Sequence, residues 1–112
     1  MEKEVKVVDS NTMEPETTKT GSRIKRLITK TKDGSDNITF SIGIIAGGID
    51  IIESFESDAV YYMIEGRSTI EWDSNSAELT EGVAIYIPAG TEVRYRAEKD
   101  HKLISIFSPA RI

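Results

Sequence analysis

The stretch from Gly82 to Gly90, Gly-Val-Ala-Ile-Tyr-Ile-Pro-Ala-Gly, constrains the fold more than any other part of the chain. A short apolar run lies between a glycine and a Pro-x-Gly turn, and its length suits a buried strand better than a helix. Proline removes a backbone N–H and glycine accepts a left-handed backbone, so the strand is expected to end at this turn. The stretch predicts one buried strand of a small β-barrel.

The rest of the chain repeats the same kind of pattern. Apolar residues alternate with polar ones, and turn residues recur about every eight to twelve positions, which predicts about nine strands. Phe40, Ile42 and Ile44 are expected to share one face of a strand over residues 38–45, after a turn at residues 32–35. No window shows a helical stripe. The predicted fold is all-β, in an antiparallel closed barrel or sandwich, since closure removes exposed sheet edges.

Two segments are expected along the chain. Residues 1–22 are predicted to be an N-terminal strand, Val5–Val8, followed by a polar arm from Ser10 to Ser22, and residues 23–112 are predicted to form the barrel domain. The arm is long enough to let Val5–Val8 cross to a neighbouring molecule. We therefore expect a homodimer that forms through the sheet and the N-terminal strand.

Composition excludes several classes of function. The 112 residues carry 14 Lys and Arg against 19 Asp and Glu, a net charge of −5, which argues against nucleic acid or an anionic membrane as partner. The charged N-terminus and the lack of a long apolar run predict a cytoplasmic protein. There is no cysteine and one histidine, His101, so thiolate chemistry and multi-histidine metal centres within one chain are excluded. His101 follows a predicted turn and is expected at the surface.

Residues 23–109 resemble the cupin family, whose fold is a small antiparallel jelly-roll barrel. Gly82, Pro88 and Gly90 match its second motif, in which Val93 stands at the histidine position; Gly48 and Gly66 match the ends of its first motif. In that first motif Glu53 and Phe55 stand at the histidine positions and Ala59 at the glutamate position. The resemblance implies a cupin barrel without its usual metal ligands, and we expect no metal and no other cofactor.

Within the cupins, residues 59–66 and 96–109 are similar to the ectoine synthase branch and to the ethanolamine-utilisation cupins. The ectoine branch holds iron with a glutamate, a tyrosine and a histidine, and Ala59, Ile85 and Val93 stand at those positions here. Asp58 and Tyr86 are each one residue out of place, which on a strand means the opposite face. The ethanolamine-utilisation cupins lack the histidines and rely on acidic residues, so the resemblance implies that they are the nearer functional analogue.

Strand alternation selects the candidate site residues. If Ala59 points into the barrel, Tyr61 does too, and Tyr95 follows Val93 inward. A carboxylate at Glu53 in a mostly apolar cup would have a raised pKa and suit general acid–base chemistry. We predict Glu53, Tyr61 and Tyr95 as catalytic residues. The predicted ligand-binding residues are Arg26, for a carboxylate group, together with Phe55, Met63 and Val93.

Three functions stay open at this point. The first is a cupin that binds a small polar metabolite in the barrel, with or without metal-independent acid–base chemistry. The second is a non-catalytic sensor or structural cupin whose barrel is filled by Phe55, Met63, Ile85 and Val93. The third is a metal-dependent enzyme with non-standard ligands such as Glu53 and Asp58. An open cavity lined by Glu53, Tyr61 and Tyr95 would contradict the filled barrel.

Overall fold

The computed structural model describes residues 4–112, which form ten strands, one short α-helix and one 3-10 turn. The 3-10 turn is Ser10–Thr12 and the helix α1 is Lys30–Asp33. The strands are β1 (Glu16–Thr17), β2 (Arg23–Ile28), β3 (Thr39–Ile45), β4 (Asp50–Glu53), β5 (Asp58–Glu65), β6 (Ser68–Trp72), β7 (Asn75–Leu79), β8 (Ala84–Ile87), β9 (Val93–Arg96) and β10 (His101–Ser108). No described helix is long and apolar enough to cross a membrane.

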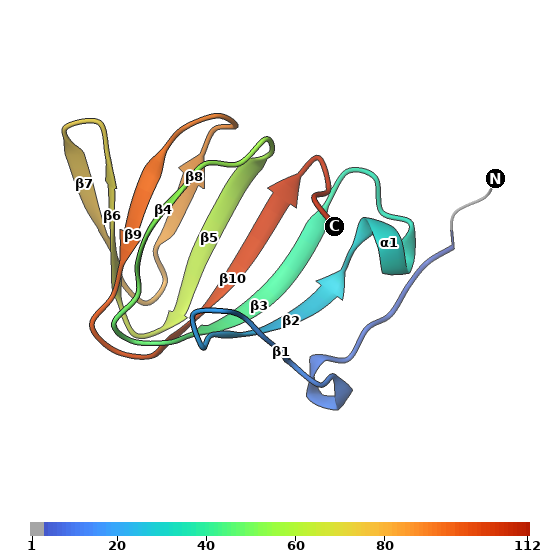
Figure 1. Ribbon diagram of the computed structural model, residues 1–112. Helices are drawn as coiled ribbons and strands as arrows, with labels where there is room; N and C mark the ends of the chain where they lie inside the picture. Colours follow the sequence, from blue (N-terminus) through green and yellow to red (C-terminus); the bar gives the residue numbers. More distant parts are fainter. Residues whose placement is uncertain (1–3) are drawn as a thin grey trace.

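The strands form two sheets that face each other (Figure 1). One sheet has six strands in the order β1-β2-β3-β10-β5-β8, and the other has four in the order β4-β9-β6-β7. Every strand pair is antiparallel. The sheets enclose the interior as two walls of a jelly roll, without a strand ladder joining them in the described chain. The all-β antiparallel prediction is confirmed.

Glycines at the predicted turns adopt the backbone that the motif requires. Gly82 and Gly90 both have φ of +83°, and β8 lies between them as expected. Gly66, at the end of β5, has φ of +92°, and a Cβ atom there would lie 2.7 Å from the Cβ of His101. These positions favour glycine because other residues pay a steric penalty at positive φ.

The predicted N-terminal strand does not form within a single chain, and its pairing with a neighbouring molecule stays a prediction. Val5–Val8 forms no strand, and Val5 and Val7 are 94% and 92% exposed. The free edge of β2 is instead occupied by Glu16–Thr17, which pairs with Arg23 and Ile24. A strand needs a partner edge as well as an alternating pattern, and Val5–Val8 pairs with no strand of the described chain. Residues 1–3 of the predicted N-terminal segment lie outside the described residues, and the division at residue 22 stays a prediction.

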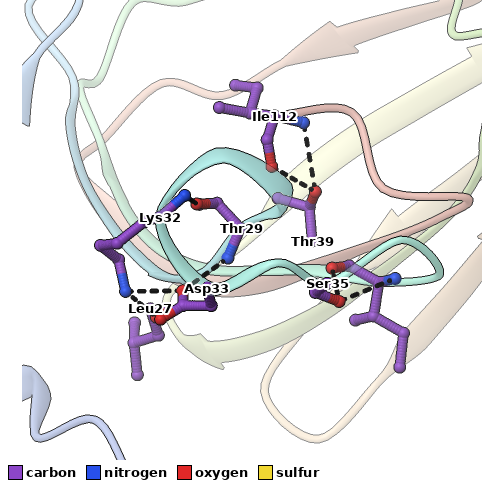
Figure 2. A network of polar contacts seen from close by, with 8 residues as sticks. Leu27, Thr29, Lys32, Asp33, Ser35, Thr39 and Ile112 are labelled. Atoms are coloured by element: carbon purple, nitrogen blue, oxygen red, sulfur yellow. Dashed lines mark hydrogen bonds and ion pairs between the residues drawn. The ribbon is translucent and has the colours of Figure 1, made fainter. Parts of the chain in front are cut away.

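The turn expected at residues 32–35 is a single helical turn, α1. Thr29 caps it by accepting a hydrogen bond from the Lys32 backbone N–H at 2.9 Å, and Gly34 ends it in the left-handed conformation (Figure 2). The side chain of Asp33 accepts in return from the Thr29 backbone N–H at 2.9 Å. The reciprocal cap places the chain for its entry into β3.

The fully packed core occupies one part of the interior. It is built by the inward residues of β5 to β9, of which Met63, Ile70, Leu79, Ile87 and Val93 are at most 3% exposed. Apolar residues of β4 and β10 extend this cluster toward β2 and β3. There the packing stops, and a cavity begins.

Candidate functional site

A cavity of about 230 Å³ lies between the two sheets. Its walls are inward residues of β2, β3, β10 and β5 on one side and of β4 and β9 on the other, with Arg111 and Ile112 at its rim. Most of the lining is apolar; the polar side chains are those of Arg26, Ser41, Glu53, Tyr61, Tyr95, Ser105 and Arg111. A largely apolar pocket with a few converging polar groups is typical of a small-molecule site. The cavity contradicts the filled-barrel alternative.

Glu53 and Tyr61 form a hydrogen-bonded pair in this cavity. The Tyr61 hydroxyl donates to Oε2 of Glu53 at 3.1 Å, from β5 to β4 across the interior. Burial raises the pKa of Glu53, while the Tyr61 hydrogen bond and the charge of Arg111 oppose that rise. Burial, with the nearby Glu53 charge, also holds the pKa of Tyr61 well above its usual value. Tyr61 therefore stays a hydrogen-bond donor, and Glu53 is the group able to exchange a proton.

Tyr95 forms a second polar pair, with His101. The Tyr95 hydroxyl lies 2.5 Å from Nε2 of His101, and Nδ1 of His101 lies 3.0 Å from the carbonyl oxygen of Lys99. Because a carbonyl oxygen only accepts, Nδ1 carries a hydrogen, and in the neutral ring Nε2 then accepts from Tyr95. Burial raises the pKa of Tyr95 to about 12. The ring of Tyr95 also meets that of Tyr61 edge to face at 5.9 Å between centroids.

The expectation of a surface His101 is wrong, because the residue is only 4% exposed. His101 is the first residue of β10 and shares the inward side with Leu103, so its ring enters the interior. The missing side chain at Gly66 leaves the space that it needs. The polar neighbours Asp100 and Lys102 suggested a solvated turn, but strand parity decided the outcome.

Two arginines reach the cavity in different ways. Arg26 of β2 donates from Nε to Oε2 of Glu16 in β1 at 2.7 Å, so a carboxylate of the chain already faces it. Arg111 follows the last strand and lies over the rings of Phe55 and Phe107, at 4.6 and 4.8 Å from their centroids. Sequence analysis missed Arg111, because no alternation pattern places a residue beyond the end of a strand.

The other predicted ligand-binding residues separate into two groups. Phe55 lines the cavity, as do Arg26, Glu53, Tyr61 and Tyr95. Met63 and Val93, at 0% and 2% exposure, point inward as expected but belong to the packed core and do not line this cavity.

The side chains present do not fit the metal centre of the usual cupins. In residues 4–112 no three His, Cys, Asp or Glu side chains converge as ligands. Both ring nitrogens of His101 already have partners, and Asp58 faces away from the cavity, where it accepts from the Tyr86 hydroxyl at 3.0 Å and the Ala89 backbone N–H at 2.8 Å. Glu53 is thus the one carboxylate among the cavity-lining residues, and no step is derived through a metal.

Comparison with known proteins agrees with this architecture. No family model matches the chain. An uncharacterized protein of Streptomyces coelicolor is 27% identical over 73 residues, which are 62% of this chain and 70% of that protein. At this identity and coverage the similarity does not assign a family.

Solved structures are similar over nearly the whole chain. An RmlC-like cupin from Shewanella frigidimarina superimposes with a TM-score of 0.83 at 19% identity, over 99% of this chain and 96% of its own. A putative ethanolamine utilization protein, EutQ, from Salmonella typhimurium gives 0.81 at 16% identity, over 96% and 88%. Ectoine synthase from P. lautus gives 0.75 at 24% identity, over 85% and 68%. The predicted fold family is thereby confirmed: this chain has the fold of the cupin superfamily.

Proposed function

We propose that this cupin-fold protein binds a small polar metabolite in its cavity and that Glu53 exchanges a proton with it, without a metal. The observation that carries the proposal is the Glu53–Tyr61 pair inside an otherwise mostly apolar cavity. A raised pKa moves a carboxyl group toward the pH at which a general acid or base works best. The polar groups around Glu53 orient the bound metabolite.

Each polar residue has a distinct part in this proposal. Glu53 takes a proton from an acidic C–H or N–H of the bound molecule and returns it, so that the carboxylate and carboxyl forms alternate. Tyr61 holds the Glu53 side chain by its donated hydrogen bond, and its oxygen lone pairs stay available to the ligand. Tyr95 sends its proton toward Nε2 of His101 in the neutral ring, so it presents an accepting oxygen to the cavity.

Proton exchange can be measured without knowledge of the natural reaction. A thermal-shift screen of small carboxylates, amino acids and amines identifies ligands, because a compound that binds only the folded state raises the melting temperature. Each ligand is then incubated with protein in D2O, and NMR follows deuterium entry at its acidic C–H positions. We expect exchange with the wild type and none with Glu53→Gln, which keeps a side chain of the same shape.

The control is to measure ligand binding by the Glu53→Gln variant. If this variant binds the same ligand and still exchanges deuterium at the wild-type rate, Glu53 is not the proton carrier. If the wild type binds ligands but catalyses no exchange, the second candidate applies, a sensor that binds without turnover. The cavity supports that candidate equally well up to the binding step.

The cupin fold is compatible with catalysis but does not select it. Solved structures similar to this chain include ectoine synthase from P. lautus and the polyketide cyclase RemF from Streptomyces resistomycificus, at 24% and 18% identity. Both names describe enzymes. At such identities their activities are no guide to the substrate here, which is why the ligand screen comes first.

We also propose that the protein is a homodimer through the outer face of its six-stranded sheet. On this face the register sets Ile106 between Phe40 and Val60, and Ile104 between Ile42 and Tyr62. Tyr62 is 41% exposed and the other five residues are half-buried. Clustered apolar side chains that stay accessible to water favour association.

Sedimentation velocity tests the dimer. We expect Ile104→Lys to convert it to monomers, while Lys102→Ala, one row away on the same strand, leaves it unchanged. A wild type that sediments as a monomer at high micromolar concentration would contradict the proposal. The cytoplasmic location was predicted from the charged N-terminus and the lack of a long apolar run, and the absence of a nucleic-acid or membrane partner from the net charge of −5; both stay predictions.

A further inference from the structure

Arg111 lies in an aromatic corner at the rim of the cavity. Its guanidinium carbon is 4.6 Å from the ring centroid of Phe55 and 4.8 Å from that of Phe107, and the two rings meet edge to face at 4.9 Å. Attraction between the guanidinium charge and the two rings holds the group in place without using one of its hydrogen-bond donors. Its N–H groups, which point along the plane, stay available to an acceptor.

The backbone on both sides of Arg111 is held in place. The N–H groups of Arg111 and Ile112 both donate to Oγ1 of Thr39, at 2.9 and 3.3 Å. Figure 2 shows the contact between Thr39 and Ile112. The Ile112 carbonyl also accepts from the Lys30 backbone N–H. Thr39 is itself only 2% exposed. On the other side, the Pro109 carbonyl accepts from the hydroxyl of buried Ser57 at 2.7 Å. The guanidinium is thus presented by an anchored segment.

Arg111 also differs from Arg26 in its charge partners. Arg26 is paired with Glu16, whereas no carboxylate of residues 4–112 forms an ion pair with Arg111. The charge of Arg111 opposes the rise that burial causes in the pKa of Glu53, but the two side chains form no hydrogen bond with each other. A cation at a cavity rim without a salt-bridge partner has hydrogen-bonding capacity left for a ligand.

We infer that Arg111, rather than Arg26, is the anion-binding residue of the cavity and that the ligand is a small carboxylic acid with a short apolar body. This inference rests on the proposed function, since it assumes that the cavity holds a ligand. The carboxylate pairs with the free edge of Arg111, and the apolar part lies against Ile49, Ile51 and Leu103. The far end of the ligand then reaches Glu53 and Tyr61.

The test uses 4-methylpentanoate and its primary amide as matched probes, titrated by NMR. We expect wild type to bind the carboxylate about tenfold more tightly than the amide, the size of effect typical of a charged hydrogen-bond pair at a partly exposed site. Arg111→Met should remove this preference by weakening carboxylate binding far more than amide binding, and the amide binding that remains shows that the variant is folded. Arg67→Met, which breaks an exposed pair with Glu78, serves as the matched control and should keep the preference.

The outcomes separate this inference from the proposed function. If both probes bind wild type equally, or if Arg26→Met removes the preference while Arg111→Met does not, the assignment to Arg111 is overturned and the cavity remains a binding site. If neither probe binds and the wider ligand screen also finds nothing, both proposals fall. Should Arg111→Met not fold, Arg111→Lys replaces it, with a weakened preference expected because lysine lacks the planar fork.

Discussion

The two parts of the barrel interior differ in how their inward positions are filled. Between β5 and β9 these positions hold large apolar side chains such as Met63, Ile70 and Val93, and the space is closed. Between β2, β3 and β10 they hold Ser41, Gly43 and Ser105, and a cavity of about 230 Å³ remains. The register sets Ser105 opposite both Ser41 and Tyr61. One jelly roll thus combines a packed part with a hollow part, where we propose the binding site.

Truncating an inward side chain should destabilise the protein far more in the packed part than in the hollow part. Met63→Ala leaves a void among fully buried neighbours, and we expect a loss of about 2–5 kcal/mol in the free energy of unfolding. Ile51→Ala, which enlarges a space that is already open, should lose clearly less. Urea denaturation of both variants measures the difference. Equal losses would show that the cavity collapses around its lining in solution.

Enlarging an inward side chain should also destabilise the packed part more than the hollow part. Ala59 is 0% exposed inside the packed core, so Ala59→Val is expected to cost about 1–3 kcal/mol by overpacking. Ser105→Val places its extra methyl groups in the cavity, and we expect a change of less than about 1 kcal/mol together with weaker binding of the carboxylate probe. A large destabilisation by Ser105→Val would contradict the division of the interior.

The Tyr95–His101 pair lies at the border between the two parts. His101→Phe leaves the buried Tyr95 hydroxyl without this partner, and we expect a loss of about 1–3 kcal/mol. Tyr95→Phe in the same background should recover part of that loss, because it removes the unsatisfied group. A double-mutant cycle by urea denaturation measures the coupling. Strictly additive losses would show that the hydrogen bond contributes nothing to stability.

The smallest expected effect is a pH dependence from Glu53 in the hollow part. Its folded pKa is raised above the unfolded value of 4.5, so the folded state holds this proton more tightly. The contribution of Glu53 to stability is then greatest below pH 4.5 and falls as the pH rises through the folded pKa of Glu53. Glu53→Gln should remove this decline above pH 4.5. Other groups titrate in both proteins, so the difference between their stability curves isolates Glu53; identical curves would contradict the shift.

The site was partly predictable because strand parity is a local property. The alternation that places Ala59 and Val93 inward also places Tyr61 and Tyr95 inward, and all four have that orientation. The same rule was available for His101 but was outweighed by its charged neighbours. Arg111 and the partner of Arg26 were beyond reach, because both depend on which segments meet across the fold.

The sequence by itself determined the turn positions, the antiparallel all-β class and the inward set of side chains, since glycine conformation and two-residue alternation act within a few neighbouring residues. Only the tertiary structure decided which inward residues pack and which line a cavity, because that depends on the sizes of residues facing one another from distant strands. The same long-range assembly turned His101 into a buried partner of Tyr95 and brought Arg111 to the rim beside Phe55.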